Sequence, residues 1–191
     1  MTVAHIGIIA EDDSDVEVLK HLAGKLASHR FTVSKFTGKG CGSLRRKAPG
    51  WCLALSHKGC SSVVLVHDRD RHDENVLRGE LEEVLRNIKI QLKVVVIPCE
   101  ELEAWLLSDM KALKQSMNLA TMPKIIPNPE TTASPKECIG ELVRMHSKNK
   151  SKRYVNTVHN LQIAKAVSVS TISRRCPSFR YFERFIAQSV G

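Results

Sequence analysis

The stretch SSVVLVHDRDRHD at residues 61–73 constrains the fold of this chain more than any other part of the sequence. Its first half, Val63 to Val66, is an unbroken apolar run without the polar alternation of a half-exposed strand. Such a run predicts a strand that is buried on both faces, which is typical of parallel sheets covered by helices. Acidic residues follow at once, and open α/β sheets bind ligands at the carboxyl ends of their strands. The stretch therefore predicts a parallel sheet with a functional site at its edge.

Asp68 and Asp70 form the central pair of this predicted site. On an extended segment, residues two positions apart point to the same side. Neighbouring carboxylates repel each other unless a cation lies between them, and hard oxygen ligands suit Mg²⁺ or Mn²⁺. His67 and His72 flank the pair, either as further ligands or as residues outside the ligand set. A plainer interpretation is that an Asp-rich turn caps the helix that follows.

Predicted strands and helices alternate along the first part of the sequence. The strands are expected at residues 3–10, 31–36, 62–66 and 92–97, with amphipathic helical patterns between them. This alternation predicts an α/β, Rossmann-like fold with a four-stranded, mostly parallel sheet flanked by helices. We expect a core at residues 1–115 and a basic helical C-terminal extension at residues 116–191 that packs on it.

Acidic residues end three of these four strands. Glu11 follows the first strand, and Glu101 and Glu103 follow the fourth. In the strand order 2-1-3-4, Glu11 and Asp68 lie side by side at the carboxyl edge of the sheet. Asp15 lies one helical turn beyond Glu11 and can turn back to the same place. Independent helix caps explain such a gathering poorly, so the pattern favours a metal site that these carboxylates share.

Several other patterns predict local structure. Residues 14–17 have the spacing of a capping box, which predicts a helix that begins at Asp15, and residues 134–137 begin another with proline in its first turn. The aromatic face of a last helix at residues 179–186 and the indole of Trp105 are expected in the core.

The charge is distributed unevenly along the 191 residues, which carry a net charge of +9. Residues 1–110 contain 15 Lys and Arg against 16 Asp and Glu, whereas residues 111–191 contain 14 against 4. An acidic sheet edge followed by a basic segment suits a polyanion held near a cation-dependent site. An ordinary basic tail has the same charge, so charge alone does not decide.

Two basic segments are candidates for phosphate contacts, which give affinity without sequence specificity. The first is a glycine-rich loop at residues 37–47, and the second is the run HSKNKSKR at residues 146–153. Their candidate cations are Lys39, Arg45, Arg46, Lys148, Lys150, Lys152 and Arg153. A flexible, solvated loop is the alternative interpretation for both segments.

The sequence predicts a cytosolic protein. No apolar run approaches the about 20 residues of a membrane-spanning helix, and the N-terminal segment lacks the basic region of a signal peptide. The six cysteines include no Cys-x-x-Cys pair, so we expect reduced, partly buried thiols and no zinc site.

Glu11 in IIAEDDSD, together with Asp68 and Asp70 in LVHDRDRHD, resembles the acidic signature of the Toprim domain, which recurs in topoisomerases, primases and nucleases. The spacing from Glu11 to Asp15 and the acidic exit of the fourth strand are most similar to the overcoming-lysogenisation-defect nucleases. More narrowly, the phrases GKGCGSLRRK, DRDRHD, EELEAW and RCPSF resemble those of a small bacterial family of Toprim-like proteins. The narrow resemblance covers nearly the whole chain.

The Toprim resemblance implies Mg²⁺- or Mn²⁺-dependent phosphoryl transfer on DNA or RNA, in bacterial defence or DNA repair. Asp68 and Asp70 would hold the cation, and Asp15 with Glu101 or Glu103 would complete the metal ligands. Glu11 would be a ligand or the residue that transfers a proton. Glu11, Asp68 and Asp70 are thus the predicted catalytic residues.

Two other classes of function stay open at this point. One is another metal-dependent enzyme, such as a nucleotidyl transferase. The other is a non-catalytic module that binds nucleic acid or a partner protein. The partner could be a second copy of the same chain. The number of retained acids argues against the second class, because clustered carboxylates destabilise a protein that binds no cation.

Overall fold

The computed structural model describes residues 3–38 and 41–191. Over these residues, four strands form one sheet in the order β2-β1-β3-β4, and every pairing is parallel. The strands are β1 (Ala4–Ala10), β2 (Phe31–Thr37), β3 (Ser62–Val66) and β4 (Leu92–Val96). The helices are α1 (Asp13–Leu26), α2 (Cys41–His57), α3 (Glu74–Arg86), α4 (Glu103–Leu106), α5 (Met110–Ser116), the 3₁₀ turn η1 (Pro129–Thr131), α6 (Pro135–His146), α7 (Asn156–Ala166), α8 (Val169–Arg175) and α9 (Phe179–Val190). The predicted α/β fold is confirmed.

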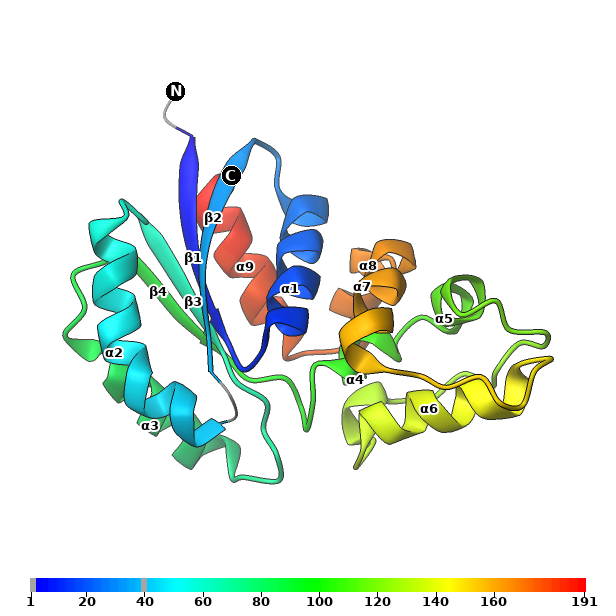
Figure 1. Ribbon diagram of the computed structural model, residues 1–191. Coiled ribbons are helices and arrows are strands. Elements are labelled where there is room, and N and C mark those ends of the chain that lie inside the picture. Colours follow the sequence, from blue (N-terminus) through cyan, green and yellow to red (C-terminus); the bar gives the residue numbers. More distant parts are fainter. Residues whose placement is uncertain (1–2, 39–40) are drawn as a thin grey trace.

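Helices cover both faces of the sheet (Figure 1). On one face, α2 and α3 pack Leu55 and Leu81 into an apolar cluster with Leu65 of β3. On the other face, α1 and α9 contribute Leu19 and Phe182 to a second cluster. Because β3 is covered on both sides, every one of its residues is buried, as its unbroken apolar run predicts.

The helix α2 begins earlier than the sequence indicates. The predicted loop at residues 37–47 is largely helical, because α2 starts at Cys41 and continues through Pro49. Leu44, Ala48, Cys52 and Leu55 recur at helical spacing and are all buried. The prediction of a loop was wrong, because burial of this apolar stripe outweighs the low helix propensity of the glycines and of Pro49.

The N-terminus of α1 differs from the predicted capping box. The helix begins at Asp13, and Asp12 is its N-cap, with a side-chain oxygen that accepts the backbone N–H of Asp15 at 3.0 Å. The hydroxyl of Ser14 is buried and has no hydrogen-bond partner among the described residues. The helix therefore starts two residues earlier than predicted, which places Asp15 inside its first turn.

The C-terminal half shares a hydrophobic core with the sheet. The aromatic face of α9 is fully buried, as predicted, and apolar residues from both halves belong to one cluster. α7 packs along α1, and Lys25 Nζ of α1 donates to three carbonyls at the end of α7 at 2.6–2.8 Å. A domain boundary near residue 115 stays a prediction.

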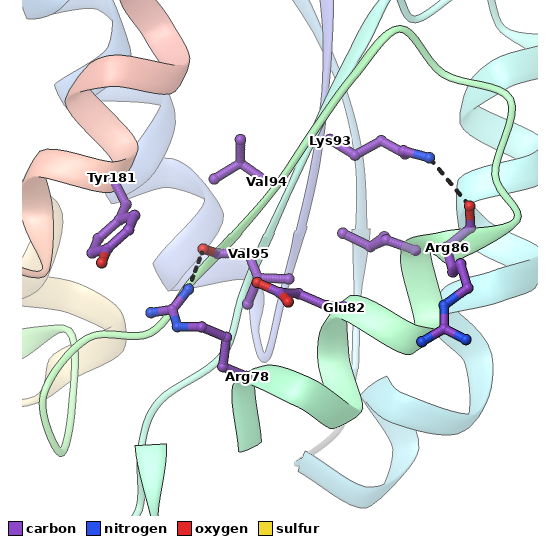
Figure 2. A pocket seen from close by; sticks show the side chains of 8 residues that line it. Arg78, Glu82, Arg86, Lys93, Val94, Val95 and Tyr181 are labelled. Carbon is purple, nitrogen blue, oxygen red and sulfur yellow. Dashed lines mark hydrogen bonds between the residues drawn. The ribbon is translucent and has the colours of Figure 1, made fainter. Parts of the chain in front are cut away.

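The free edge of β4 lies along a groove of about 320 Å³ between α3 and α9 (Figure 2). Arg78 donates to the carbonyl of Val95 at 3.3 Å, and Lys93 Nζ donates to the carbonyl of Arg86 at 3.4 Å. Charged side chains at a strand edge discourage pairing with another strand. None of the described residues that were predicted for the functional site lines this groove.

The described part of the chain contains no helix that combines the length and the apolar character needed to cross a membrane. Cys52, Cys60, Cys99, Cys138 and Cys176 are free thiols.

Candidate functional site

The structure brings Glu11 and Asp68 together at the carboxyl edge of the sheet. β1 and β3 pair with Ile9 opposite Leu65, so the residues that follow the two strands meet. The backbone N–H of Asp68 donates to Glu11 Oε1 at 3.2 Å. His67 is fully buried, and its Nδ1 lies 3.4 Å from the same oxygen. These contacts hold together two acids that follow different strands.

Three further carboxylates surround Asp68. We define the acid cluster as Glu11, Asp15, Asp68, Asp70 and Glu103. Each of the other four members is close enough to raise the pKa of Asp68. Asp15 comes from the first turn of α1, Asp70 from the loop after β3, and Glu103 from α4. The cluster thus gathers acids from four separate segments of the chain.

The pKa values of Glu11, Asp15 and Asp68 are raised, because burial disfavours the charged carboxylate and neighbouring negative charges add to this effect. Burial is the largest cause for Asp68, whose pKa lies well above its usual value. Burial and neighbouring carboxylates raise the pKa of Asp15 to about 8. Burial and the charge of Asp70 raise the pKa of Glu11 to about 7. Without a cation, the cluster therefore retains protons that ordinary carboxyl groups release below neutral pH.

Asp70 reaches the acid cluster from a turn, and the prediction of an extended segment was wrong. Asp70 (φ 48°) and Arg71 (φ 64°) adopt the left-handed conformation, which is uncommon outside glycine. Glu100 of the adjacent loop is also left-handed (φ 59°); its carboxylate pairs with Arg69 and accepts the N–H of Arg71 at 2.9 Å. The turn leaves Asp70 exposed, whereas Asp68 is half-buried.

The plainer interpretation, an Asp-rich helix cap, applies to a different residue of this loop. Asp73 is the N-cap of α3, and its carboxylate accepts the N–H groups of Asn75 at 2.9 Å and Val76 at 3.0 Å. Asp68 instead accepts the N–H of Leu102 at 3.0 Å, across the edge of the sheet. Capping of α3 therefore does not explain Asp68.

Replacing Arg71 by glycine is expected to raise the free energy of unfolding by about 1 kcal/mol, because glycine adopts a positive φ without strain. The side chain of Arg71 is exposed, and its backbone N–H, which the variant keeps, makes the bond to Glu100. Urea denaturation measures the change. Arg71→Ala is the control, since it removes the side chain and keeps the strain; an equal gain in both variants would contradict a backbone origin.

Glu101 lies at the same edge but serves as a helix cap. Its Oε2 accepts the backbone N–H of Lys136 at 2.8 Å, in the first turn of α6. Ser134, the cap that the sequence predicts, makes no side-chain capping bond. The start of α6 is therefore as predicted, but its cap comes from a residue distant in the sequence.

Glu103 is buried, and two residues that the sequence did not indicate contact its carboxylate. Asn160 Nδ2 donates to Glu103 Oε1 at 3.0 Å, and the hydroxyl of Tyr154 lies 3.3 Å from the same oxygen. These contacts span 57 and 51 residues of sequence, so local spacing carries no signal for them.

Two of the predicted phosphate contacts near β2, Arg45 and Arg46, lie on α2 instead of in a loop. Arg45 forms an ion pair with Glu80 of α3 at 2.5 Å, and its positive charge offsets a small part of the rise in the pKa of Glu11. Arg46 is exposed on the same helix. Lys39 lies outside the described residues.

Most of the cations in the basic run at residues 146–153 make hydrogen bonds within the protein instead of extending into solvent. Lys150 donates to the carbonyl of Met145 at 2.7 Å, Lys152 donates to that of Met117, and Arg153 donates to that of Lys150 at 3.2 Å. These three cations therefore stabilise the loop itself. Lys148 is exposed.

The chemistry of the acid cluster suits a hard divalent cation, because carboxylate oxygens are the ligands that Mg²⁺ and Mn²⁺ prefer. Within residues 3–38 and 41–191, however, no three His, Cys, Asp or Glu side chains are grouped closely enough to hold a metal ion. A cation shared by these carboxylates would thus require them to lie closer together than they do in this structure.

The sequence profile of one protein family, described as a domain of unknown function (DUF4276), matches residues 10–187. This range contains the whole acid cluster as well as Tyr154 and Asn160. No curated protein and no solved structure matches the chain. Because the match covers nearly the whole chain, the chain belongs to the DUF4276 family.

Proposed function

We propose that this member of the DUF4276 family is a Mg²⁺- or Mn²⁺-dependent nuclease that hydrolyses phosphodiester bonds in DNA or RNA. The observation that carries the proposal is the gathering of four carboxylates around Asp68 at the carboxyl edge of a parallel sheet. Their mutual repulsion destabilises the protein without a cation, so a structural role alone explains the cluster poorly. The resemblance of Glu11, Asp68 and Asp70 to the Toprim signature agrees with this proposal.

The roles follow from the position of each acid. Asp68, Asp15, Asp70 and Glu103 would hold the cation, which when bound stabilises negative charge that develops on a phosphate. Glu11 would accept a proton from the attacking water, because its pKa of about 7 in the metal-free protein lies near neutral pH. His67 Nδ1 lies 2.6 Å from the carbonyl of Asp68 and fixes the loop that carries it.

Cations beside the acid cluster support a polyanionic substrate. Arg45 pairs with Glu80 and lies within electrostatic range of Glu11, and Lys136 lies in the first turn of α6, where its backbone N–H contacts Glu101. Both would contact phosphates on either side of the scissile bond, and exposed cations such as Arg46 and Lys148 would extend the contact. Affinity for nucleic acid is therefore expected to fall steeply as the salt concentration rises.

Cleavage of labelled single-stranded and duplex DNA and RNA oligonucleotides in Mg²⁺ or Mn²⁺ tests the proposal. The wild type is expected to cleave at least one of them, and Asp68→Asn is expected to lower the rate by roughly 100-fold or more. The matched control is Glu82→Gln, an exposed acid on α3 outside the cluster, which should leave the rate unchanged. Binding without cleavage, or cleavage that survives in Asp68→Asn, would overturn the proposal.

A further inference from the structure

Glu103 occupies an unusual place for a carboxylate, because it is only 4% exposed and lies within an acid cluster. Asn160 is fully buried and donates to Glu103 through its amide nitrogen. The hydroxyl of Tyr154 contacts the amide oxygen of the same Asn160. Tyr154 thus fixes the orientation of the amide, since a rotated Asn160 would turn its oxygen toward the carboxylate.

The chain of contacts runs in one direction, from Tyr154 through Asn160 to Glu103. The hydroxyl of Tyr154 has one proton to donate, and its contact with Asn160 Oδ1 is shorter than its 3.3 Å separation from Glu103 Oε1. The amide of Asn160 then donates to the carboxylate at 3.0 Å. Both residues belong to the segment 154–160, which ties the start of α7 to α4.

We propose that Tyr154 and Asn160 are positioning residues that hold the Glu103 carboxylate at the acid cluster, ready to bind a cation. The C-terminal half then contributes to the site itself, in addition to the sheet and its loops. This inference rests on the proposed function, because Glu103 matters as a ligand only if the cluster binds a metal. Outer partners of metal ligands typically change metal affinity by about 10- to 100-fold when they are removed.

The first measurement is Mn²⁺ affinity by isothermal titration calorimetry. Tyr154→Phe removes only a hydroxyl, and Asn160→Leu removes the donor at nearly constant volume; each is expected to weaken Mn²⁺ binding about 10-fold or more. Ser178→Ala is the matched control. It removes a different buried hydrogen bond of α4, which Trp105 Nε1 donates to Ser178 Oγ at 2.8 Å and which does not involve Glu103. Unchanged affinity in Tyr154→Phe, or an equal loss in Ser178→Ala, would overturn the inference.

A double-mutant cycle tests whether Tyr154 acts through Glu103. In a Glu103→Gln background, Tyr154→Phe is expected to change Mn²⁺ affinity by less than about twofold. A loss as large as that in the wild-type background would show that Tyr154 affects the site by another route, and the inference would fail.

The same double-mutant cycle, measured as melting temperatures in the presence of a chelator, separates this inference from the proposed function. In the metal-free protein, Tyr154→Phe is expected to lower the melting temperature when it is introduced into the wild-type background. In the Glu103→Gln background, the same substitution is expected to lower the melting temperature by at most half as much. If the wild type binds no Mn²⁺, either alone or with a short DNA oligonucleotide, but this coupling is present, the proposed function fails and Tyr154 and Asn160 still hold Glu103. If Mn²⁺ binds and both cycles are additive, the metal site of the proposed function stands and the positioning role is wrong.

Discussion

The metal-free protein is expected to lose stability as the pH rises from about 4 to about 8. Glu11 and Asp15 have folded-state pKa values of about 7 and about 8, above their ordinary values of 4.5 and 3.8. Between these limits the folded chain binds more protons than the unfolded chain, so the free energy of unfolding decreases with pH. One pKa unit corresponds to about 1.4 kcal/mol, so the expected loss is about 3 kcal/mol or more. Urea denaturation in chelator across this pH range measures it.

Asp68→Asn isolates the contribution of the acid cluster to this loss. The variant keeps the side-chain oxygen that accepts from Leu102 and removes one charge from the centre of the cluster. At pH 8 it is expected to be more stable than the wild type by about 1–2 kcal/mol, with a shallower dependence on pH. Asp13→Asn is the control, since Asp13 is exposed and pairs with Lys35 at 3.0 Å. Identical pH dependence in the wild type and Asp68→Asn would show that the carboxylates do not repel one another.

Trp105→Ala is expected to lower the free energy of unfolding by about 3–5 kcal/mol. The indole is fully buried and packs edge-on against Phe179, with 5.0 Å between the ring centroids. Its Nε1 donates to Ser178 Oγ at 2.8 Å, and Glu130 in turn accepts from Ser178. Removing Trp105 therefore opens a cavity and breaks the network that joins α4, η1 and α9. Chemical denaturation measures the change.

Trp51→Ala is the matched control for this prediction. Trp51 is half-buried and stacks on Phe36, with 5.6 Å between the ring centroids. Because much less surface is removed from water, a loss of only about 1–2 kcal/mol is expected. Equal losses in the two variants would contradict the central place of Trp105 in the fold.

The sheet was predictable because its signals are local. The run from Val63 to Val66 is buried by neighbours on both faces, and its composition alone indicates this. The amphipathic helices between the strands make the helical layers predictable as well, because an apolar stripe that repeats every three or four residues packs against the sheet. The placement of Glu11 beside Asp68 then follows from the strand order.

The parts that the sequence did not reveal depend on tertiary contacts. The left-handed turn at Asp70 and Arg71 is held by the carboxylate of Glu100, 29 residues away from Arg71. Glu101 replaces Ser134 as the cap of α6 because the fold places a carboxylate at that helix end. No propensity or spacing rule identifies such partners, since each pair is adjacent only in the folded chain.

Isothermal titration calorimetry of Mn²⁺ with the wild type and with Asp68→Ala/Asp70→Ala tests the metal site most directly. The wild type is expected to bind with a dissociation constant of about 1 mM or tighter, and the double variant is expected to show no binding. The titration is repeated with a short DNA oligonucleotide, whose phosphates supply further oxygen ligands. A folded wild type that binds no Mn²⁺ in either titration would contradict the account, and the acid cluster would then not be a metal site.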